Sequence, residues 1–357
     1  MSITVFAAIA GVATLVLSLI LPVVVRPLLV KLGVMDVPNE RSSHERPILR
    51  GLGLAVLVAM TAVGGVATAT SAVADPEAPA WKFMLIVTLG SLCARLLGFS
   101  EDLRGISVPV RSAILLLIAV STTVVLLWLA RTLPLPENAG LDVGTLPLWF
   151  VLVLGVYGVL FISSYINVAN FMDGLNGISG LHGLIAGLAF AAAGALSGHG
   201  WLLVMGVILA AGFAGFLPWN VSQPGAFLGD VGSYLLGGAV AITSFAAFVA
   251  GVPILATIGP MVIYFGDVGT TLVKRMRKGH KWDEPHKEHA YQRLQQLGMP
   301  HVAASAINAG FTLAASLLGL ASFFVAPIWW LLLLVGGLAL VVLYQVTPRL
   351  LAKKFAA

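Results

Sequence analysis

Long stretches without a charged residue dominate this sequence. They cover residues 1–25, 51–74, 112–130, 143–172, 174–229, 231–266 and 302–348. A helix needs about 20 apolar residues to cross the hydrocarbon core of a bilayer. Hydrophobic residues make up 59% of the chain and charged residues only 10%, whereas a soluble domain carries about 25% charged residues. The chain is therefore predicted to be an all-α polytopic membrane protein, which excludes a soluble enzyme, a secreted enzyme and a disordered chain.

Two of these stretches are long enough for two spans each. Turns divide them at Ser197–Gly200 and at Ala326-Pro327. Two further spans carry a charge in their interior, Arg95 in one and Asp267 in the other. The sequence predicts eleven transmembrane helices, over residues 3–25, 51–71, 82–99, 112–130, 147–166, 178–196, 201–218, 232–250, 253–273, 303–325 and 328–347.

The basic residues indicate how these helices are oriented. In an eleven-helix arrangement, every Lys and Arg except Lys82 and Arg131 falls on one side of the membrane. Basic residues concentrate in cytoplasmic loops, so we expect the amino terminus outside and the carboxyl terminus in the cytoplasm. The first apolar segment has no preceding basic region and is followed by Arg26. We therefore interpret it as a retained anchor and not as a cleaved signal.

Four acidic residues are expected at the cytoplasmic boundary: Glu101, Asp102, Asp173 and Asp230. Acids near a membrane are costly unless they are solvated, paired or bound to a metal. Oxygen ligands without sulfur suit a hard cation such as Mg²⁺, which also binds phosphate oxygens. The alternative is that these acids are ordinary helix caps, but several acidic motifs on one face favour a binding site.

Two of these acids lie in glycine-rich segments, Asn167–Gly177 and Phe227–Ser233. Glycine lets a backbone approach a ligand closely, and the N–H groups at the start of a helix favour an anion. We expect Gly229 and Gly232 to leave room for a diphosphate beside Asp230.

The loop after residue 273 contains a histidine-rich segment. If it is helical from His286, then His286, His289 and Arg293 share one face and form a donor-rich surface suited to phosphate. A zinc site made by His280, Asp283, His286 and His289 is the weaker alternative, and a plain solvated loop is another. His44, in the first cytoplasmic loop, is a weaker site candidate.

Asp267 lies inside a predicted span, which is also typical of ion-coupled transporters. It precedes Lys274 by about two helical turns, so we interpret it as a structural residue that pairs with Arg95 or with a loop cation. A transporter is kept as the alternative from a different functional class.

Five motifs together carry a resemblance to a known family. They are Asp36-Val-Pro38-Asn39-Glu-Arg41-Ser-Ser-His44 with Pro47 and Arg50-Gly51-Leu-Gly53, Gly98-Phe-Ser-Glu101-Asp102, Asn170-Phe-Met-Asp173-Gly174, Phe227-Leu-Gly229-Asp230, and His286-Lys-Glu-His289-Ala-Tyr-Gln-Arg293-Leu. In this order the sequence resembles the polyprenyl-phosphate N-acetylhexosamine-1-phosphate transferases, which are glycosyltransferase family 4. The histidine segment resembles the O-antigen-initiating branch. The phospho-N-acetylmuramoyl-pentapeptide transferases of peptidoglycan synthesis are related.

The resemblance implies a reaction in which undecaprenyl phosphate attacks the sugar-bound phosphorus of a UDP-N-acetylhexosamine, releasing UMP. It also implies one membrane domain over 1–357, with an active site made by loops 26–50, 98–111, 167–177, 219–231 and 274–301. It places the protein in the bacterial inner membrane with its site facing the cytoplasm. The partners implied are the UDP-sugar, undecaprenyl phosphate and the bilayer, without nucleic acid, and a homodimer is left open.

The residue roles that the resemblance implies centre on a metal. Asp230 resembles the Mg²⁺ ligand, with Asp173 supporting the metal and Mn²⁺ as a substitute ion. The expected catalytic residues are Glu101, Asp102, Asp173 and Asp230. The expected substrate-binding residues are Arg50 and His44 for the lipid phosphate, Phe227 and Asn176 for the uracil, His286, His289 and Arg293 for the diphosphate or the sugar, and Asn170 without a more specific role.

Two positions depart from the family pattern, because Glu101 stands where aspartate is usual and Asn176 stands where many relatives carry a second aspartate. The first change alters the reach of the acid, and the second can alter nucleobase contact or sugar preference. The alternative within the family is a muramoyl-pentapeptide transferase. The motifs do not identify the N-acetyl sugar.

Overall fold

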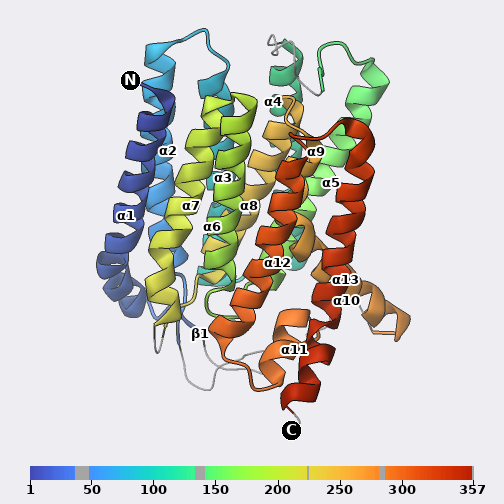
Figure 1. The fold of residues 1–357 in the computed structure, drawn as a ribbon. Helices are drawn as coiled ribbons and strands as arrows, with labels where there is room; N and C mark the ends of the chain where they lie inside the picture. Colours follow the sequence, from blue (N-terminus) through green and yellow to red (C-terminus); the bar gives the residue numbers. More distant parts are fainter. Residues whose placement is uncertain (37–47, 133–140, 223–224, 281–285, 356–357) are drawn as a thin grey trace.

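The computed structural model describes residues 1–36, 48–132, 141–222, 225–280 and 286–355. Within these ranges, eleven helical segments are long and apolar enough to cross a membrane, which confirms the all-α fold of eleven spans. They pack as a bundle of roughly parallel and antiparallel helices (Figure 1). The spans are α1 (Ile3–Lys31), α2 (Gly53–Ala74), α3 (Ala80–Arg104), α4 (Val108–Thr132), α5 (Leu148–Met172), α6 (Ile178–Ser197), α7 (Gly200–Val221), α8 (Gly229–Val249), the composite α9–η1–α10 segment, α12 (His301–Ala321) and α13 (Trp330–Phe355).

Several helices extend beyond the predicted apolar limits. The prediction ends the third helix at residue 99, but α3 continues to Arg104, so Glu101 and Asp102 lie in its last turns and not in a loop. Likewise α5 continues to Met172 and α8 begins at Gly229. The physical reason is that the first charge marks the edge of the hydrocarbon layer, whereas backbone hydrogen bonding continues into the polar interface.

The predicted helix over 253–273 is interrupted. It consists of α9 (Ile254–Ile258), the 3-10 turn η1 (Gly259–Met261) and α10 (Val262–Arg277). Pro260 lies within the turn, and proline lacks the N–H that an α-helix needs at this point. A second 3-10 turn, η2 (Pro327–Trp329), precedes α13.

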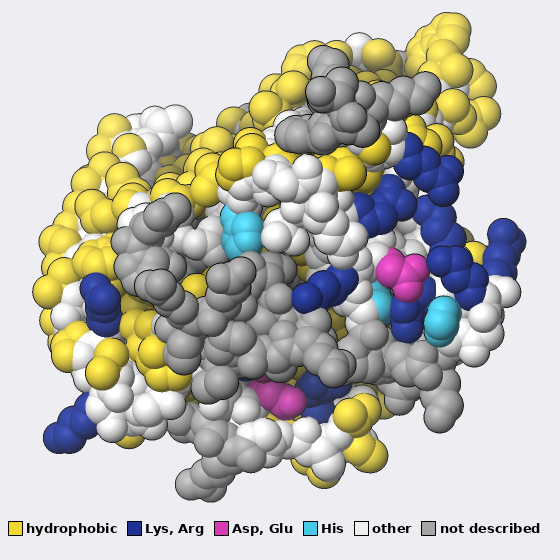
Figure 2. Space-filling model, turned by 90° about the horizontal axis from the view of Figure 1, so that it is seen from below, with side chains coloured by type: hydrophobic (Ala, Val, Ile, Leu, Met, Phe, Trp, Pro, Cys, Tyr) yellow, Lys and Arg dark blue, Asp and Glu magenta, His cyan; other side chains and the backbone are white. Residues whose placement is uncertain are grey.

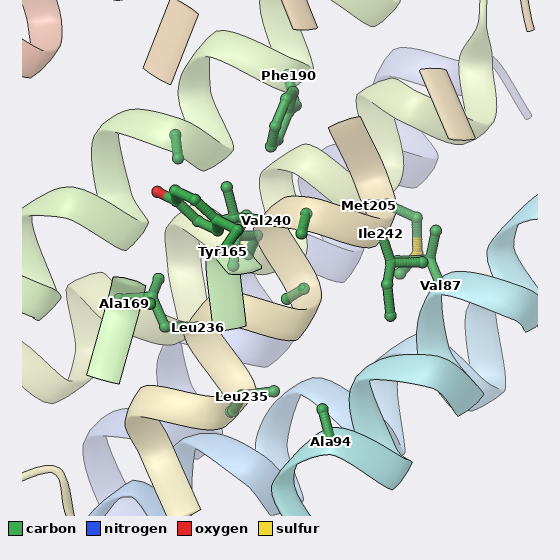
Figure 3. Close-up of a cluster of buried hydrophobic side chains, with 14 of the residues drawn as sticks. Val87, Ala94, Tyr165, Ala169, Phe190, Met205, Leu235, Leu236, Val240 and Ile242 are labelled. Carbon is green, nitrogen blue, oxygen red and sulfur yellow. The ribbon is translucent and has the colours of Figure 1, made fainter. Parts of the chain in front are cut away.

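Helix α8 is the centre of the bundle. In its most apolar stretch 94% of the residues are buried inside the protein, whereas only 11% are buried in that of the η2–α13 segment. Helix α13 therefore presents most of its surface to lipid. Figure 3 shows Leu235, Leu236 and Val240 of α8 among side chains of α3, α5 and α6. Between membrane helices, close packing and polar contacts supply the stability, because lipid removes the hydrophobic driving force.

Three short elements lie at the lower end of the bundle in Figure 1. Strands β1 (Met35–Asp36) and β2 (Ile48–Leu49) form an antiparallel pair, with Met35 opposite Leu49. Helix α11 (Ala290–Gln296) packs beneath α12 and α13. The two-residue strands are the one departure from an all-helical fold in the described residues.

Candidate active site

The end of α3, the end of α5 and the start of α8 meet at the lower end of the bundle (Figure 1). Figure 2 looks onto this end of the molecule: Lys and Arg side chains form a band along one side, with acidic and histidine side chains next to them, and hydrophobic side chains cover much of the rim. Polar chemistry is therefore concentrated where the apolar bundle ends.

Backbone pairing brings the first loop to α8. The Phe227 N–H donates to the Leu49 carbonyl at 2.8 Å, and the N–H groups of Leu52 and Gly53 donate to the carbonyls of Phe227 and Leu228 at 3.1 and 2.9 Å. The segment before α8 thus continues the pairing of β2. This pairing holds Arg50 opposite the first turn of α8.

Arg50 bridges two carboxylates that belong to different helices. Its Nε lies 2.9 Å from Asp102 Oδ1, and its Nη2 lies 2.6 Å from Asp230 Oδ2. The Asp102 side chain is 1% exposed, whereas those of Asp230 and Arg50 are 20% and 33% exposed. A planar guanidinium suits this forked arrangement. We call Arg50, Asp102 and Asp230 the Arg50 triad.

Asp102 also caps α8 from the neighbouring helix. Its two carboxylate oxygens accept from the N–H groups of Asp230 at 3.1 Å and Val231 at 2.8 Å. An anion at a helix N-terminus satisfies N–H groups that have no partner within the helix. The anion expected at the start of this helix is therefore a carboxylate of the protein itself, which corrects the prediction of a substrate anion there.

Glycines in this region serve helix contact. A Cβ on Gly98 would collide with the carbonyl oxygen of Asp230, and one on Gly229, where φ is +75°, would lie 2.7 Å from the Gly51 nitrogen and 2.9 Å from Asp102 Oδ2. A Cβ on Gly232 would meet the Leu228 side chain and come within 3.0 Å of another backbone carbon. The prediction that Gly229 and Gly232 leave room for a diphosphate is wrong, because protein atoms fill that space.

Asn170, from the last turns of α5, orients Asp230. Its Nδ2 donates to Asp230 Oδ1 and to Ser233 Oγ, both at 2.9 Å. Both oxygens of Asp230 are therefore engaged, Oδ1 by Asn170 and Oδ2 by Arg50. Asn170 thus contacts a predicted metal ligand, and its expected contact with substrate stays a prediction.

Asp173 lies just after α5 and belongs to the same electrostatic cluster. Burial raises the pKa of its carboxyl to about 7; the Ser179 hydroxyl, which donates to Oδ1 at 2.6 Å, opposes this rise, and the nearby Asp230 and Asp102 charges add to it. Arg50 partly offsets those charges. The carboxyl therefore holds its proton to a higher pH than an ordinary aspartate does, first because it is buried and then because of the neighbouring carboxylates.

Glu101 faces a different partner from Asp102. Its Oε1 lies 3.3 Å from Nη1 of Arg111 on α4, and its buried Oε2 has no hydrogen-bond partner among the residues that the structure describes. The structure thus places Glu101 beside the Arg50 triad and not within it, and its catalytic role stays a prediction.

The residues expected on the nucleotide side hold two loops together. Asn176 Nδ2 donates to the Asn220 carbonyl at 2.8 Å, while the buried Asn176 Oδ1 finds no hydrogen-bond partner within the described part of the chain. Phe227 is half-buried in the segment that pairs with β2. Their nucleotide contacts stay predictions, and His44 lies outside the described residues.

The histidine segment differs from its prediction in one respect. Helix α11 begins at Ala290, because His289 has an extended backbone with φ −59° and ψ 151°; the expected helix from His286 is wrong. The rings of His286 and His289 still lie next to each other, with centroids 4.8 Å apart. Arg293 Nη2 donates to the carbonyl of Gln345 on α13 at 2.5 Å, so it is turned toward that helix.

Tyr291 connects this segment to the Asp173 segment. Its Oη donates to the Phe171 carbonyl at 3.0 Å, and a Cβ on Gly174 would lie about 3.0 Å from its ring. The residues predicted for the site did not include Tyr291, Ser179, Ser233 or Gln345. Single uncharged polar residues near the end of an apolar helix give no sequence signal of their own.

The carboxylates in and around the Arg50 triad offer only oxygen atoms as possible metal ligands. Among the residues that the structure describes, no group of three or more His, Cys, Asp or Glu side chains is arranged to hold a metal ion. In this arrangement the single positive charge of the Arg50 guanidinium offsets part of the negative charge of the two carboxylates. The weaker zinc alternative includes Asp283, which lies outside the described residues.

An apolar groove of about 570 Å³ runs between α5, α10, α12 and α13. Val262, Phe265, Gly266, Gly269 and Thr270 supply the α10 side, and their three- and four-residue spacing places them on one helix face. Asp267 and Thr271 lie on the opposite face. Helix α10 thus has an apolar face toward the groove and a polar face toward α11.

Comparison with known proteins identifies related sequences. Residues 84–248 match glycosyl transferase family 4. The chain is 26% identical over 303 residues to the probable undecaprenyl-phosphate N-acetylglucosaminyl 1-phosphate transferase of Bacillus subtilis, covering 82% of this chain and 78% of that protein. It is 27% identical to the decaprenyl-phosphate N-acetylglucosaminephosphotransferase of Mycolicibacterium smegmatis, over 78% of this chain and 72% of that one. It is 30% identical to the phospho-N-acetylmuramoyl-pentapeptide-transferase of Desulforudis audaxviator, over 71% of this chain and 81% of that protein.

Proposed function

Because this chain belongs to glycosyl transferase family 4, we propose that it transfers N-acetylglucosamine 1-phosphate from a UDP-sugar to a polyprenyl phosphate such as undecaprenyl phosphate. An oxygen of the acceptor phosphate forms a bond to the sugar-bound phosphorus. The bond from that phosphorus to the bridging oxygen breaks, and UMP leaves with the electron pair. The products are UMP and a polyprenyl-diphospho-sugar that stays in the membrane.

The single observation that carries this proposal is the Arg50 triad at the polar end of an apolar bundle. A membrane-bound acceptor and a water-soluble anionic donor can meet only at such a boundary. Both substrates are anions, so the site needs positive charge to bring them together. Arg50 is 33% exposed and lies beside Asp230, where it can pair with a phosphate. The family membership argues against the transporter alternative.

We further propose that Mg²⁺, with Mn²⁺ as a substitute, is held by Asp230 and Asp173. Their oxygen ligands fit a hard cation, and a divalent cation would offset the cost of keeping the buried Asp173 carboxylate charged beside Asp230 and Asp102. The ion would neutralise charge on the phosphate oxygens. Arg50 would then share its charge between Asp102 and the acceptor phosphate, while Asn170 keeps Asp230 oriented.

We assign the groove between α5, α10, α12 and α13 to part of the acceptor's prenyl chain. Its lining is almost entirely apolar, and it lies among helices that are long enough to cross a membrane. The proposal also places the polar end in the cytoplasm of a bacterial inner membrane, because nearly all Lys and Arg residues fall at that end. An O-antigen or related envelope polysaccharide is the proposed pathway.

A donor panel tests the function. Purified protein with undecaprenyl phosphate and Mg²⁺ is expected to release UMP from UDP-N-acetylglucosamine and to move radiolabelled sugar phosphate into extractable lipid. Because one relative is a muramoyl-pentapeptide transferase, the muramoyl-pentapeptide donor is the second arm. Turnover of that donor alone would favour the alternative, and the absence of turnover with every donor would contradict the proposed reaction.

A further inference from the structure

Helix α11 is too short to hold its own position. It has seven residues, and isolated helices shorter than about 12 residues are marginal in water. The segment that contains His289 and Arg293 therefore depends on contacts with the bundle. One of these contacts is fully buried Asp267 on α10.

The Asp267 carboxylate accepts hydrogen bonds from three separate elements. The Ala290 N–H, the first of α11, donates to both carboxylate oxygens at 3.1 Å. Gln345 Nε2 of α13 donates to Oδ1 at 2.7 Å, and Thr271 Oγ donates to the same oxygen at 3.2 Å. Asp267 is 0% exposed, and a buried carboxylate is stable only when it is well hydrogen-bonded or paired. The expected pairing with Arg95 is wrong, because Arg95 donates to the Leu57 carbonyl and to Thr61 on α2.

Gln345 extends this contact to the basic residues. Its Oε1 accepts from Lys274 Nζ at 3.0 Å, and its backbone carbonyl accepts from Arg293 Nη2 at 2.5 Å. The amide orientation follows from its neighbours, because an ammonium only donates and a carboxylate only accepts. One side chain of α13 thus joins α10 to α11.

His289 lies against the same carboxylate. Its Nδ1 is 3.5 Å from Asp267 Oδ1, and its ring stacks nearly parallel to that of Tyr291, with 8° between the planes and 5.7 Å between the centroids. Tyr291 in turn donates to the Phe171 carbonyl, two residues before Asp173. A continuous set of contacts therefore runs from Asp267 through α11 to the Asp173 segment.

We propose that Asp267, together with Gln345, is a positioning residue of the transferase. It fixes the start of α11, and this keeps the positions of His289 and Arg293 relative to Asp173 constant. Asp267 itself touches no reacting atom in this role. The inference rests on the proposed function for its kinetic consequence, but its structural consequence can be measured without any substrate.

Three variants form a graded test. Asp267→Asn keeps the size but offers one acceptor oxygen to three donors, so an amide N–H group must face another donor. Thr271→Val removes one donor to the carboxylate. Thr347→Val is the matched control: it makes the same substitution on α13, two residues from Gln345, and the Thr347 hydroxyl donates to the Leu343 carbonyl of its own helix at 2.8 Å.

Hydrogen exchange of the full-length protein in detergent gives the first readout. Asp267→Asn is expected to speed exchange in a peptide covering residues 286–297 by about tenfold or more, with a smaller rise for Thr271→Val. Thr347→Val, and peptides from α3 and α8, should match the wild type. Unchanged exchange at 286–297 in Asp267→Asn, or a rise spread evenly over the whole bundle, would overturn the proposal.

Kinetics give the second readout. Asp267→Asn is expected to lower kcat about tenfold or more, while the KM for the polyprenyl phosphate stays within about twofold. Normal kcat in Asp267→Asn would overturn the positioning role. If the wild type transfers nothing from any donor, the proposed function fails, and the exchange measurement still decides whether Asp267 anchors α11. If Asp267→Asn does not fold, the comparison of Thr271→Val with Thr347→Val decides both readouts.

Discussion

Arg50 contacts Asp102 and Asp230 at the same time, and this shared contact sets the residue-scale chemistry. Asp102 is almost fully buried and engaged by two backbone N–H groups, whereas Asp230 keeps a fifth of its side chain exposed. Neighbouring carboxylates in different surroundings commonly take different roles. Asp102 is suited to holding α8 and Arg50 in place, and Asp230 is suited to meeting a ligand.

The first prediction concerns the charge of Asp230. Asp230→Asn keeps the size and can still accept from Asn170, so it tests metal binding more than packing. We expect kcat to fall by about 10³-fold, which corresponds to about 4 kcal/mol of transition-state stabilisation. UMP release measures this loss, and EDTA should silence the wild type until Mg²⁺ or Mn²⁺ is added. Normal turnover by Asp230→Asn would reduce the residue to a helix-capping role.

The second prediction concerns pH. The pKa of Asp173 is raised to about 7, so below that pH the protonated form prevails and a proton competes with a divalent cation for the carboxyl. The apparent Mg²⁺ affinity should therefore rise as pH increases from about 6 to about 8, and titration calorimetry without substrates can measure it. Asp173→Asn should flatten this dependence. An affinity that is constant across this range in the wild type would contradict Asp173 as a ligand.

At the scale of elements, the site is built where helix ends meet. Asp102 on α3 supplies the cap that α8 lacks in its own sequence, and Asn170 on α5 orients the first acidic residue of α8. Helix α11 reaches the same place through Tyr291. A displacement of any of these ends would change the position of a predicted ligand without altering the ligand itself.

The third prediction tests the contact between α11 and the Asp173 segment. Gly174→Ala would force a Cβ onto the Tyr291 side chain, so we expect kcat to fall about hundredfold. Tyr291→Phe alone loses one hydrogen bond, at a cost of about 1 kcal/mol. The closest clash of the new Cβ is with the Tyr291 hydroxyl, which Tyr291→Phe removes. The double variant should therefore lose less activity than the two single losses multiplied together predict. A double-mutant cycle should give about 1–2 kcal/mol of coupling, and strict additivity would contradict this contact.

At the scale of the whole molecule, the bundle separates a polar end from an apolar side. Helix α8 is enclosed, α13 mostly faces lipid, and the groove lies between α13 and α5. This arrangement lets one substrate arrive from water and the other from the bilayer.

The fourth prediction concerns the groove. Gly269 lines it and has open space around its Cα, so Gly269→Leu should fill part of it without a clash. We expect the KM for undecaprenyl phosphate to rise about tenfold, with little change for a water-soluble short-chain acceptor. Gly310→Leu is the control, because Gly310 is also an open helix position but does not line the groove. Equal effects on both acceptors would contradict a prenyl site there.

The fifth prediction concerns orientation. In a variant whose single cysteine, Cys93, is replaced by serine, a cysteine is introduced at exposed Gln296 or at exposed Glu77 in the turn between α2 and α3. A membrane-impermeant thiol reagent should label Glu77→Cys in intact cells. It should label Gln296→Cys only after permeabilisation. The reverse pattern would place the Arg50 triad on the outer face.

The sequence alone determined the membrane class, the eleven spans and the position of the acidic motifs. An apolar run of about twenty uncharged residues is typical of a membrane-spanning helix. The tertiary structure decided how those motifs are used. It assigned Asp102 to the start of α8, filled the space beside Gly229 with protein atoms, moved the start of the histidine-segment helix to Ala290 and paired Asp267 with Ala290 and Gln345. Hydropathy is a property of neighbouring residues, and so it can be read along the chain. A hydrogen bond between residues 102 and 231, or between 267 and 345, depends on how helices pack against each other, and no local pattern records it.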